Sequence, residues 1–157
     1  VMKGHRRLAF IGGFDTASTT LKRKEGFLSR LRERGITDVT IYHSDYTYEA
    51  GISAFHHLVK EQDLLHDAIF CIRDIVCAGV IDSIRPNYHL SIPDDIAVIG
   101  FDDIDLASYQ SYDITSFSQP IDDMISYTCE LLMSPEKYSQ ESNLTLYPCT
   151  LITRTTA

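Results

Sequence analysis

Several short apolar runs in this sequence are followed closely by an acidic residue. In an open parallel sheet, residues just beyond the carboxyl ends of the strands converge at one edge, and ligands bind there. Some of these acids could instead cap helices, and Asp74 fits that alternative best because a helix is expected to start directly after it. Asp102 does not fit it, since residues 104–108 make a poor helix start. The acids in question are Asp15, Asp45, Asp74 and the pair Asp102-Asp103.

The residue types that could gather around Asp102 favour the binding of a carbohydrate. A carboxylate accepts hydrogen bonds from neighbouring hydroxyls, and an arginine donates through a rigid fork. An aromatic ring can cover the apolar face of a sugar. Arg23, on the first expected helix, and Tyr46, just past the second expected strand, are placed to join Asp102. Tyr46 could equally be an aromatic at the rim that packs on the following helix.

An enzyme is the other use of aspartates at strand ends, because they could hold Mg²⁺ for phosphoryl transfer. Against this, Gly12-Gly13-Phe14-Asp15 lacks an Asp-x-Asp, and a phosphorylated receiver would need an acidic pair after the first strand and a late lysine. The phosphate-binding loop and the motifs G-x-G-x-x-G, G-x-S-x-G and H-E-x-x-H do not occur. His56 and His57 are neighbours that point about 100° apart on a helix, so they cannot share a metal. We expect no catalytic residues, no metal site and no cofactor.

Composition narrows the class of protein further. The 157 residues suffice for about one domain, and the net charge of -8 argues against direct binding of nucleic acid by this segment. The apolar runs are too short to cross a bilayer, and no apolar stretch follows the basic start, so we expect no signal peptide and a cytoplasmic location. The four cysteines lie in apolar runs without C-x-x-C spacing, which predicts buried free thiols. They are Cys71, Cys77, Cys129 and Cys149.

The first two thirds of the chain alternate between expected strands and helices. This rhythm, with short connections, predicts right-handed crossovers and an α/β fold with a Rossmann-like, doubly wound parallel sheet. The helix near residues 75–84 is apolar almost all round, so it should pack on the sheet and on something else, most simply another subunit. Gly35 fits the left-handed position that ends the first helix. The expected strands cover residues 8–12, 39–42, 67–72 and 96–101, and the helices lie near 18–34, 50–59 and 75–84.

The last third of the chain departs from this rhythm. Residues 115–119 form a short extended piece, and Pro120 is well placed as the first residue of a helix that runs to about Met133. This helix has a broad apolar stripe. Residues 144–152 then favour an irregular strand.

Three segments together resemble the lactose-repressor/galactose-repressor (LacI/GalR) family of transcription regulators. The resemblance covers essentially the whole chain, and its most specific part is the run that ends in Asp102-Asp103. Ser108-Tyr109, Ile114-Thr115-Ser116 and Gln119-Pro120 follow in the expected order. The three segments are residues 5–13, residues 67–85 and residues 92–103.

The resemblance implies the C-terminal lobe of a type I periplasmic-binding-protein-like fold, in which an effector binds between two lobes. Residues 1–113 would form this lobe, residues 114–135 a crossover strand and helix of the other lobe, and residues 136–157 a return strand. The apolar stripe on the helix of residues 120–133 would then seek another chain. Transferred position by position, the implied effector contacts are Thr19, Arg23, Tyr46, Arg73, Asp102 and Gln119.

Arg73 departs from the pattern of the family, because many sugar-sensing members have Asn at this position, directly before the residue that corresponds to Asp74. An arginine is longer and charged, so a neutral monosaccharide is in doubt. We hypothesise that Arg73 either favours an effector with a phosphate or a carboxylate, or pairs with Asp102.

The family resemblance makes an effector-sensing and dimerisation region of a repressor the leading functional interpretation. The expected partners are a sugar or related small molecule, a second copy of the chain, and operator DNA through an N-terminal head that this chain lacks. The alternative is a solute-binding protein for sugar transport or chemotaxis, which shares the fold. An enzyme with an Asp-lined sheet edge comes third.

Overall fold

The structure is a computed structural model that describes residues 4–61, 66–134 and 145–157. Six strands form one sheet in the order β2-β1-β3-β4-β5-β6. The first five run parallel, and β6 pairs antiparallel with β5. The prediction of a doubly wound parallel sheet is confirmed for those five strands. The strands are β1 (Leu8–Gly12), β2 (Val39–His43), β3 (Ala68–Cys71), β4 (Ala97–Asp102), β5 (Thr115–Ser118) and β6 (Thr150–Ile152).

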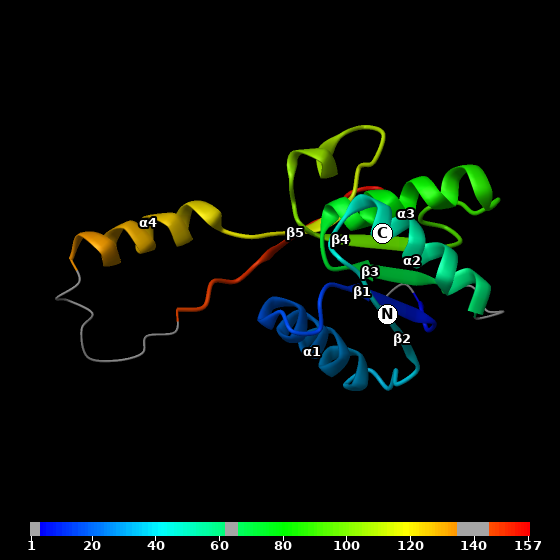
Figure 1. Cartoon of the computed structure of the whole chain (residues 1–157), viewed down its shortest axis with the longest axis horizontal. Helices are drawn as coiled ribbons and strands as arrows, with labels where there is room; N and C mark the ends of the chain where they lie inside the picture. The colour runs from blue at the N-terminus through cyan, green and yellow to red at the C-terminus, as the bar shows by residue number, and fades with distance from the viewer. Residues whose placement is uncertain (1–3, 62–65, 135–144) are drawn as a thin grey trace.

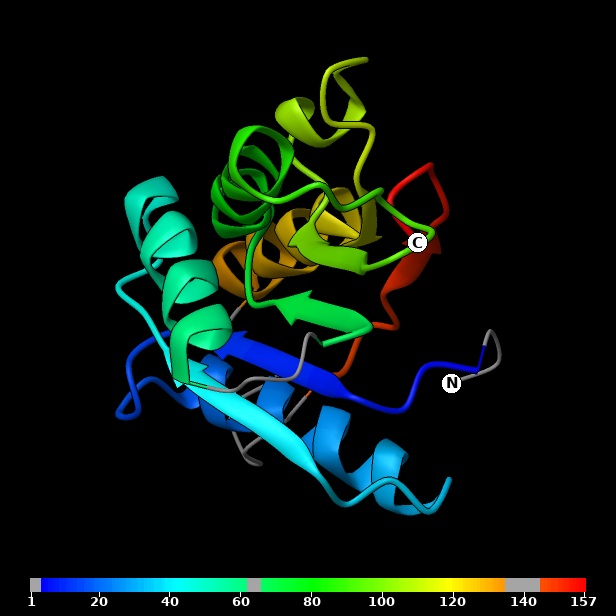
Figure 2. The ribbon, with the colours of Figure 1, turned by 90° about the vertical axis from the view of Figure 1, so that its right-hand side faces the viewer.

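Helices cover both faces of the sheet. Helix α1 (Ser18–Arg32) lies on one face, and α2 (Tyr48–Glu61) and α3 (Asp74–Asn87) lie together on the other (Figure 2). A short 3-10 helix, η1 (Asp105–Ser108), follows β4. Strand β1 is buried along its whole length because it lies between β2 and β3 with helices on both sides, which explains its continuously apolar sequence.

The expectation that another subunit covers α3 is wrong. Its apolar residues Val76, Val80 and Ile81 have no exposed surface within the single chain. Helix α2 lies against α3 at a backbone distance that only glycine allows. A β-carbon at Gly51 would lie 2.2 Å from the carbonyl oxygen of Val76, and one at Gly79 would lie 2.1 Å from the carbonyl oxygen of Tyr48. The same chain therefore buries both sides of α3.

Helix α1 ends as the sequence predicts. Gly35 has a φ of +73°, a left-handed conformation that costs glycine little. The amide of Ile36 then donates back to the carbonyl of Leu31, and both side chains pack with Leu8 in a small apolar cluster. This turn fixes the direction in which the chain enters β2.

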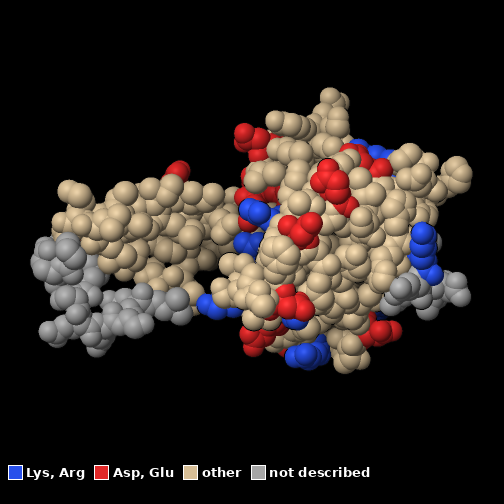
Figure 3. Space-filling model, viewed as in Figure 1, with Lys and Arg blue, Asp and Glu red and all other residues tan. Residues whose placement is uncertain are grey.

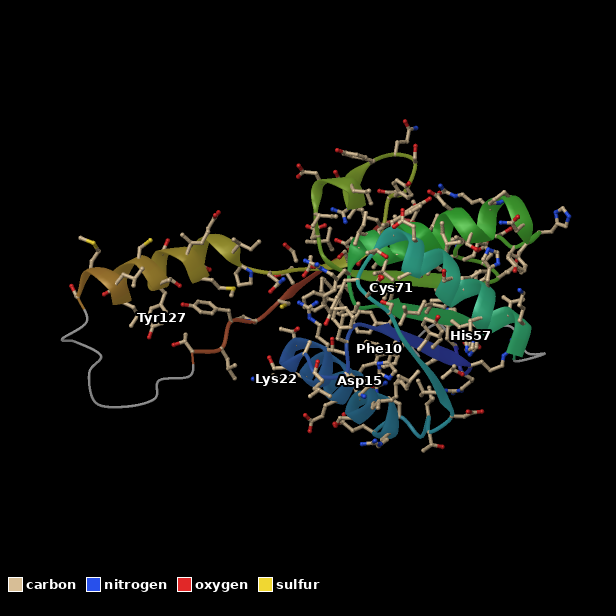
Figure 4. All side chains as sticks on the ribbon, in the orientation of Figure 1. Phe10, Asp15, Lys22, His57, Cys71 and Tyr127 are labelled. Carbon is tan, nitrogen blue, oxygen red and sulfur yellow. The ribbon has the colours of Figure 1, made fainter. Side chains whose placement is uncertain are left out.

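Helix α4 (Ile121–Met133) projects away from the sheet, and the chain leaves through β5 and returns through β6 (Figure 1). None of its residues is buried. Tyr127 faces the returning segment, and its ring lies 6.4 Å from that of Tyr147 (Figure 4). The large apolar side chains that it exposes are Ile121, Met124, Ile125, Leu132 and Met133.

Two expectations for the end of the chain need correction. The irregular strand expected over residues 144–152 is regular only at Thr150–Ile152. Residues 136–144 of the expected return segment lie outside the described residues. Cys71 and Cys77 are buried as expected, but Cys129 and Cys149 are exposed, because α4 and the return segment lie outside the core.

In the part of the chain that the structure describes, no helix combines the length and the apolar character that a bilayer crossing requires.

Candidate functional site

A hollow of about 300 Å³ lies where the carboxyl ends of the strands meet the base of α4. Side chains from α1, from the loops after β2 and β3, from the end of β4 and from the residue after β5 line it. All six residues expected from the sequence are brought together here, although what they bind stays a prediction. They are Thr19, Arg23, Tyr46, Arg73, Asp102 and Gln119.

Asp102 is the centre of the hydrogen bonds in this hollow. Its Oδ1 accepts from Nε2 of Gln119 at 2.7 Å and from Nη2 of Arg23 at 3.3 Å. Its Oδ2 accepts from Nε of Arg73 at 3.0 Å. The carboxylate is 14% exposed. One acid thus joins donors from three separate parts of the chain.

Arg23 is held on every side by the fold. Its Nη1 donates to the carbonyl of Ile72 at 2.8 Å, and its guanidinium carbon lies 3.7 Å from the centre of the Phe101 ring. The side chain is only 19% exposed. A planar cation that stacks on a ring and donates at its edge has little freedom left, so Arg23 acts as a rigid wall of the hollow.

Tyr46 is more than an aromatic at the rim. Its φ of 69° places it in the left-handed region, and its ring lies where a side chain at Gly13 would be. A β-carbon at Gly13 would lie 1.9 Å from the ring. The hydroxyl of Tyr46 bonds Oγ1 of Thr20 at 2.7 Å, and Phe14 meets the ring at its edge, with 5.3 Å between centroids. These contacts hold the ring in place beside the hollow.

Sequence reasoning missed Thr20. The resemblance selected its neighbour Thr19, which is exposed and lines the hollow, whereas Thr20 is buried and holds Tyr46. The available signal was helical spacing, because Thr20 shares the inner face of α1 with Phe27 and Leu31.

Arg73 occupies the N-cap of α3 with extended backbone angles and no side-chain cap bond. Of the two hypotheses for this residue, pairing with Asp102 occurs in the structure. Its side chain stays 51% exposed, and its guanidinium carbon lies 5.9 Å from the centre of the Tyr46 ring.

The alternative in which Asp74 caps α3 is not what the structure shows. Asp74 is the first residue of the helix, and its fully buried carboxylate reaches across to other elements. It accepts from the hydroxyl of Ser116 at 2.6 Å and from the amide of Ile104 at 3.0 Å. Burial raises the pKa of this carboxyl to about 6, while the two hydrogen bonds act in the opposite direction. A β-carbon at Gly100 would lie 2.0 Å from Oδ1 of Asp74, so this approach requires glycine.

The other acids at the strand ends serve local structure. Asp15 pairs with His43. Asp45 accepts from the amide and the hydroxyl of Thr47, and that hydroxyl in turn accepts from the amide of residue 50 in the first turn of α2. Asp103 lies 2.7 Å from Nη2 of Arg154. Of the five acids, Asp102 alone lines this hollow.

The backbone that presents Asp102 adopts an uncommon conformation. Asp102 and Asp103 have φ values of 105° and 52°, which cost non-glycine residues roughly 1–3 kcal/mol each. The amide of Asp103 donates to the hydroxyl of Ser116 at 3.2 Å, and the next amide donates to Asp74. The buried pair Asp74–Ser116 therefore holds this loop.

A larger hollow of about 550 Å³ lies beside the ends of β1 and β2. No lysine or arginine lines it; its Asp15 is paired with His43, and its Asp45 is bonded to Thr47 in its own loop. We therefore take the hollow around Asp102 as the candidate site, because polar groups converge in it, although its volume is the smaller of the two. Among the described residues, no group of three His, Cys, Asp or Glu side chains could hold a metal ion.

Comparisons with known proteins agree with this architecture. The periplasmic binding protein-like domain matches residues 1–157. The HTH-type transcriptional repressor PurR of Photobacterium profundum is 33% identical over 136 residues, which are 85% of this chain and 40% of that protein. The ribose operon repressor of Escherichia coli is 31% identical over 133 residues, which are 83% and 40%. This chain thus spans about two fifths of the length of these relatives.

A solved structure shares the fold in detail. The transcriptional regulator CelR in complex with cellobiose superposes with a TM-score of 0.86 at 25% identity, over 99% of this chain and 48% of that one. The predicted resemblance to the LacI/GalR family is confirmed. The chain belongs to the periplasmic binding protein-like domain family, in the form that LacI-family transcription repressors carry.

Proposed function

We propose that this chain is the effector-sensing region of a LacI-type DNA-binding transcription repressor, and that its hollow binds a sugar or a related small polar molecule. The observation that carries the proposal is Asp102, which is bonded by Arg23, Arg73 and Gln119 in a hollow of molecular size. The names of two relatives support it, since one represses a ribose operon and another was solved with cellobiose.

The connection to α4 suggests how binding would be transmitted. Gln119 comes directly after β5, so its bond to Asp102 ties the crossover to the floor of the hollow. An effector that takes up part of Asp102 would weaken this bond and change the preferred position of the crossover. A ligand can shift an equilibrium only through such differential contacts. In a repressor, the resulting lobe movement would alter how the DNA-binding heads sit on the operator.

We also propose a division into lobes, which the position of α4 supports. We assign residues 1–113 to one lobe, 114–135 to a crossover strand and helix of a second lobe, and 136–157 to the return. The absence of buried residues on α4 supports this division, because its apolar side chains need cover that the described residues of this chain do not supply. The second lobe or a second copy in a homodimer would supply that cover.

The relation to DNA is indirect in this proposal. A net charge of -8 does not suit contacts with phosphates, so operator binding would need a separate basic head. Action on DNA implies a cytoplasmic location, and no catalytic activity is proposed. A solute-binding protein for transport or chemotaxis would share the fold, but the repressor names of the relatives favour the regulator.

Calorimetric titration of the 157-residue chain with a panel of sugars and sugar derivatives tests the proposal. Binding should be lost in Asp102→Ala, because the three donors around it lose their common acceptor. The matched control is Asp94→Ala, an exposed acid in the turn before β4, and it should bind like the wild type. A ligand that binds Asp102→Ala as tightly as the wild type would show that the hollow is not the site.

A further inference from the structure

The charge of Asp102 is already balanced by its surroundings. Its two carboxylate oxygens accept three hydrogen bonds, of which two come from arginines and one comes from Gln119. A neutral sugar that approached Asp102 would have to displace one of these donors. The acid therefore supports the arginines, and a ligand can bond to it only by exchange with one of the present donors.

Arg23 is likewise occupied by contacts within the protein. One terminal nitrogen donates to the carbonyl of Ile72, the other donates to Asp102, and the face of the group lies on Phe101. Its contacts are those of a structural cation.

Arg73 is different, because it reaches Asp102 through Nε only. Within the described residues, its two terminal nitrogens make no hydrogen bond, and half of the side chain is exposed. Nε faces the acid, so the terminal nitrogens remain available to the hollow. A guanidinium edge of this kind binds carboxylate or phosphate oxygens in pairs.

The charged side chains that line the hollow favour the binding of an anion. Its lining holds Arg23 and Arg73 against the single acid Asp102. The next carboxylates are engaged elsewhere, since Asp103 lies against Arg154 and Asp74 is bonded to Ser116 behind the sheet edge. In Figure 3 the charged atoms of both signs gather on the body, up to the base of α4, while the visible surface of α4 is almost uncharged. The hollow thus carries a local positive excess in a chain whose net charge is -8.

An arginine at position 73 also makes the helix that follows it, α3, less stable than a better N-cap residue would. The N-cap of α3 would be better served by Asn, Ser or Asp, whose side chains bond the free amides of the first turn. A positive charge at a helix N-terminus is also electrostatically unfavourable. A residue that weakens its own helix, yet lies at a candidate binding site, indicates a role beyond local structure.

We propose that the hollow recognises a small polyhydroxylated anion, a sugar acid or a sugar phosphate, whose charged group binds the terminal nitrogens of Arg73. This inference rests on the proposed function, because it assigns a ligand class to the same hollow. The carboxylate and the phosphate share the chemistry that Arg73 recognises, and the ring of Tyr46 lies beside it to meet the carbon skeleton.

The test is a calorimetric titration of the 157-residue chain with matched neutral and anionic probes. The probes are glucose, gluconate and glucose 6-phosphate, then ribose and ribose 5-phosphate, with inorganic phosphate as the bare anion. We expect at least one sugar anion to bind about tenfold or more tightly than its neutral partner, which is the size of one charge-assisted hydrogen bond. Added salt should weaken binding of the anions and leave that of the neutral sugars unchanged.

Arg73→Gln is the informative variant, because it removes the charge and keeps a side chain able to donate to Asp102. It should abolish the preference for the anion. Arg85→Gln is the matched control: Arg85 lies in the last turn of α3, is 48% exposed against 51% for Arg73, and is not among the residues that line the hollow. It should keep the preference of the wild type.

The outcomes separate this inference from the proposed function. Binding of neutral sugars that Asp102→Ala abolishes, with no preference for anions or with a preference that Arg73→Gln retains, overturns the inference and leaves the sensing function standing. Inorganic phosphate that binds as tightly as the sugar phosphates also overturns it, since the skeleton would then add nothing. Absence of binding by every probe, or binding insensitive to Asp102→Ala, counts against the proposed function and the inference together.

Discussion

The hydroxyl of Ser116 donates a hydrogen bond of 2.6 Å to the carboxylate of Asp74, and both residues are fully buried. This bond joins the first residue of α3 to the crossover strand β5. The second oxygen of Asp74 accepts from Ile104, directly after the loop that presents Asp102. The framework behind the hollow therefore connects the acid at its centre to the strand that leads toward α4.

The stability of the chain should depend on the protonation of Asp74. Burial raises its pKa from the usual 3.8 to about 6, so the folded chain holds this proton more tightly than the unfolded chain does. The contribution of Asp74 to the free energy of unfolding is therefore greatest below pH 4 and falls as the pH rises to about 6. A shift of this size corresponds to about 2–3 kcal/mol.

Urea unfolding of the wild type and of Asp74→Asn between pH 4 and pH 7 measures this contribution. The wild type should lose stability relative to the variant as the pH rises. His66 acts in the opposite direction, because burial lowers its pKa from 6.5 and its contribution is lost as the pH falls. His66 is present in both chains, so the difference between them isolates Asp74. Parallel pH profiles for the two proteins would contradict the prediction.

Burial rather than distance should decide which arginine is coupled more strongly to Asp102. Arg73 is the nearer partner, at 3.0 Å against 3.3 Å for Arg23, but its side chain is 51% exposed against 19%. Double-mutant cycles with Asp102→Ala should give a coupling below about 1 kcal/mol for Arg73→Ala and about 1–2 kcal/mol for Arg23→Ala. Chemical unfolding measures both. The reverse order would mean that solvent screening does not govern this site.

Gly13→Ala should displace the ring of Tyr46, since the new β-carbon would lie 1.9 Å from it. We expect a loss of about 1–3 kcal/mol in stability, together with weaker ligand binding in calorimetry. The matched control is Gly26→Ala in α1, where no atom lies within 4 Å of the new β-carbon. It should stabilise the chain by about 0.5–1 kcal/mol, because alanine favours helix over glycine. Equal effects of the two substitutions would exclude a specific contact between Gly13 and Tyr46.

The apolar stripe of α4 should drive self-association of the isolated chain. Ile125→Lys or Leu132→Lys places a charge on this exposed stripe and should shift the chain toward the monomer in sedimentation velocity. Glu130→Lys, about 140° from Ile125 around the same helix, is the control and should sediment like the wild type. The melting temperature should hardly change, because α4 buries no side chain. Identical sedimentation of all these proteins at every concentration would remove α4 as an interface.

Most of the elements could be predicted from the sequence, because local patterns encode them. The buried strand β1 is a continuous apolar run, and Gly35 ends α1 in the left-handed conformation that its residue type favours. The acids after the strands indicated the edge at which polar groups converge, and Asp102 stood out because it did not fit a helix cap. The family resemblance added Thr19 and Gln119, which no local pattern would have selected.

The tertiary structure decided what each polar group does. From the sequence, a cap on its own helix was the alternative that Asp74 fitted best, but its partner Ser116 lies 42 positions away in the sequence. Helix α3 was expected to meet another subunit, but α2 of the same chain covers it through the close approach at Gly51 and Gly79. Periodicity reports which face of an element is apolar, whereas the identity of the group opposite that face depends on contacts between distant segments. These contacts exist only after the sheet has assembled.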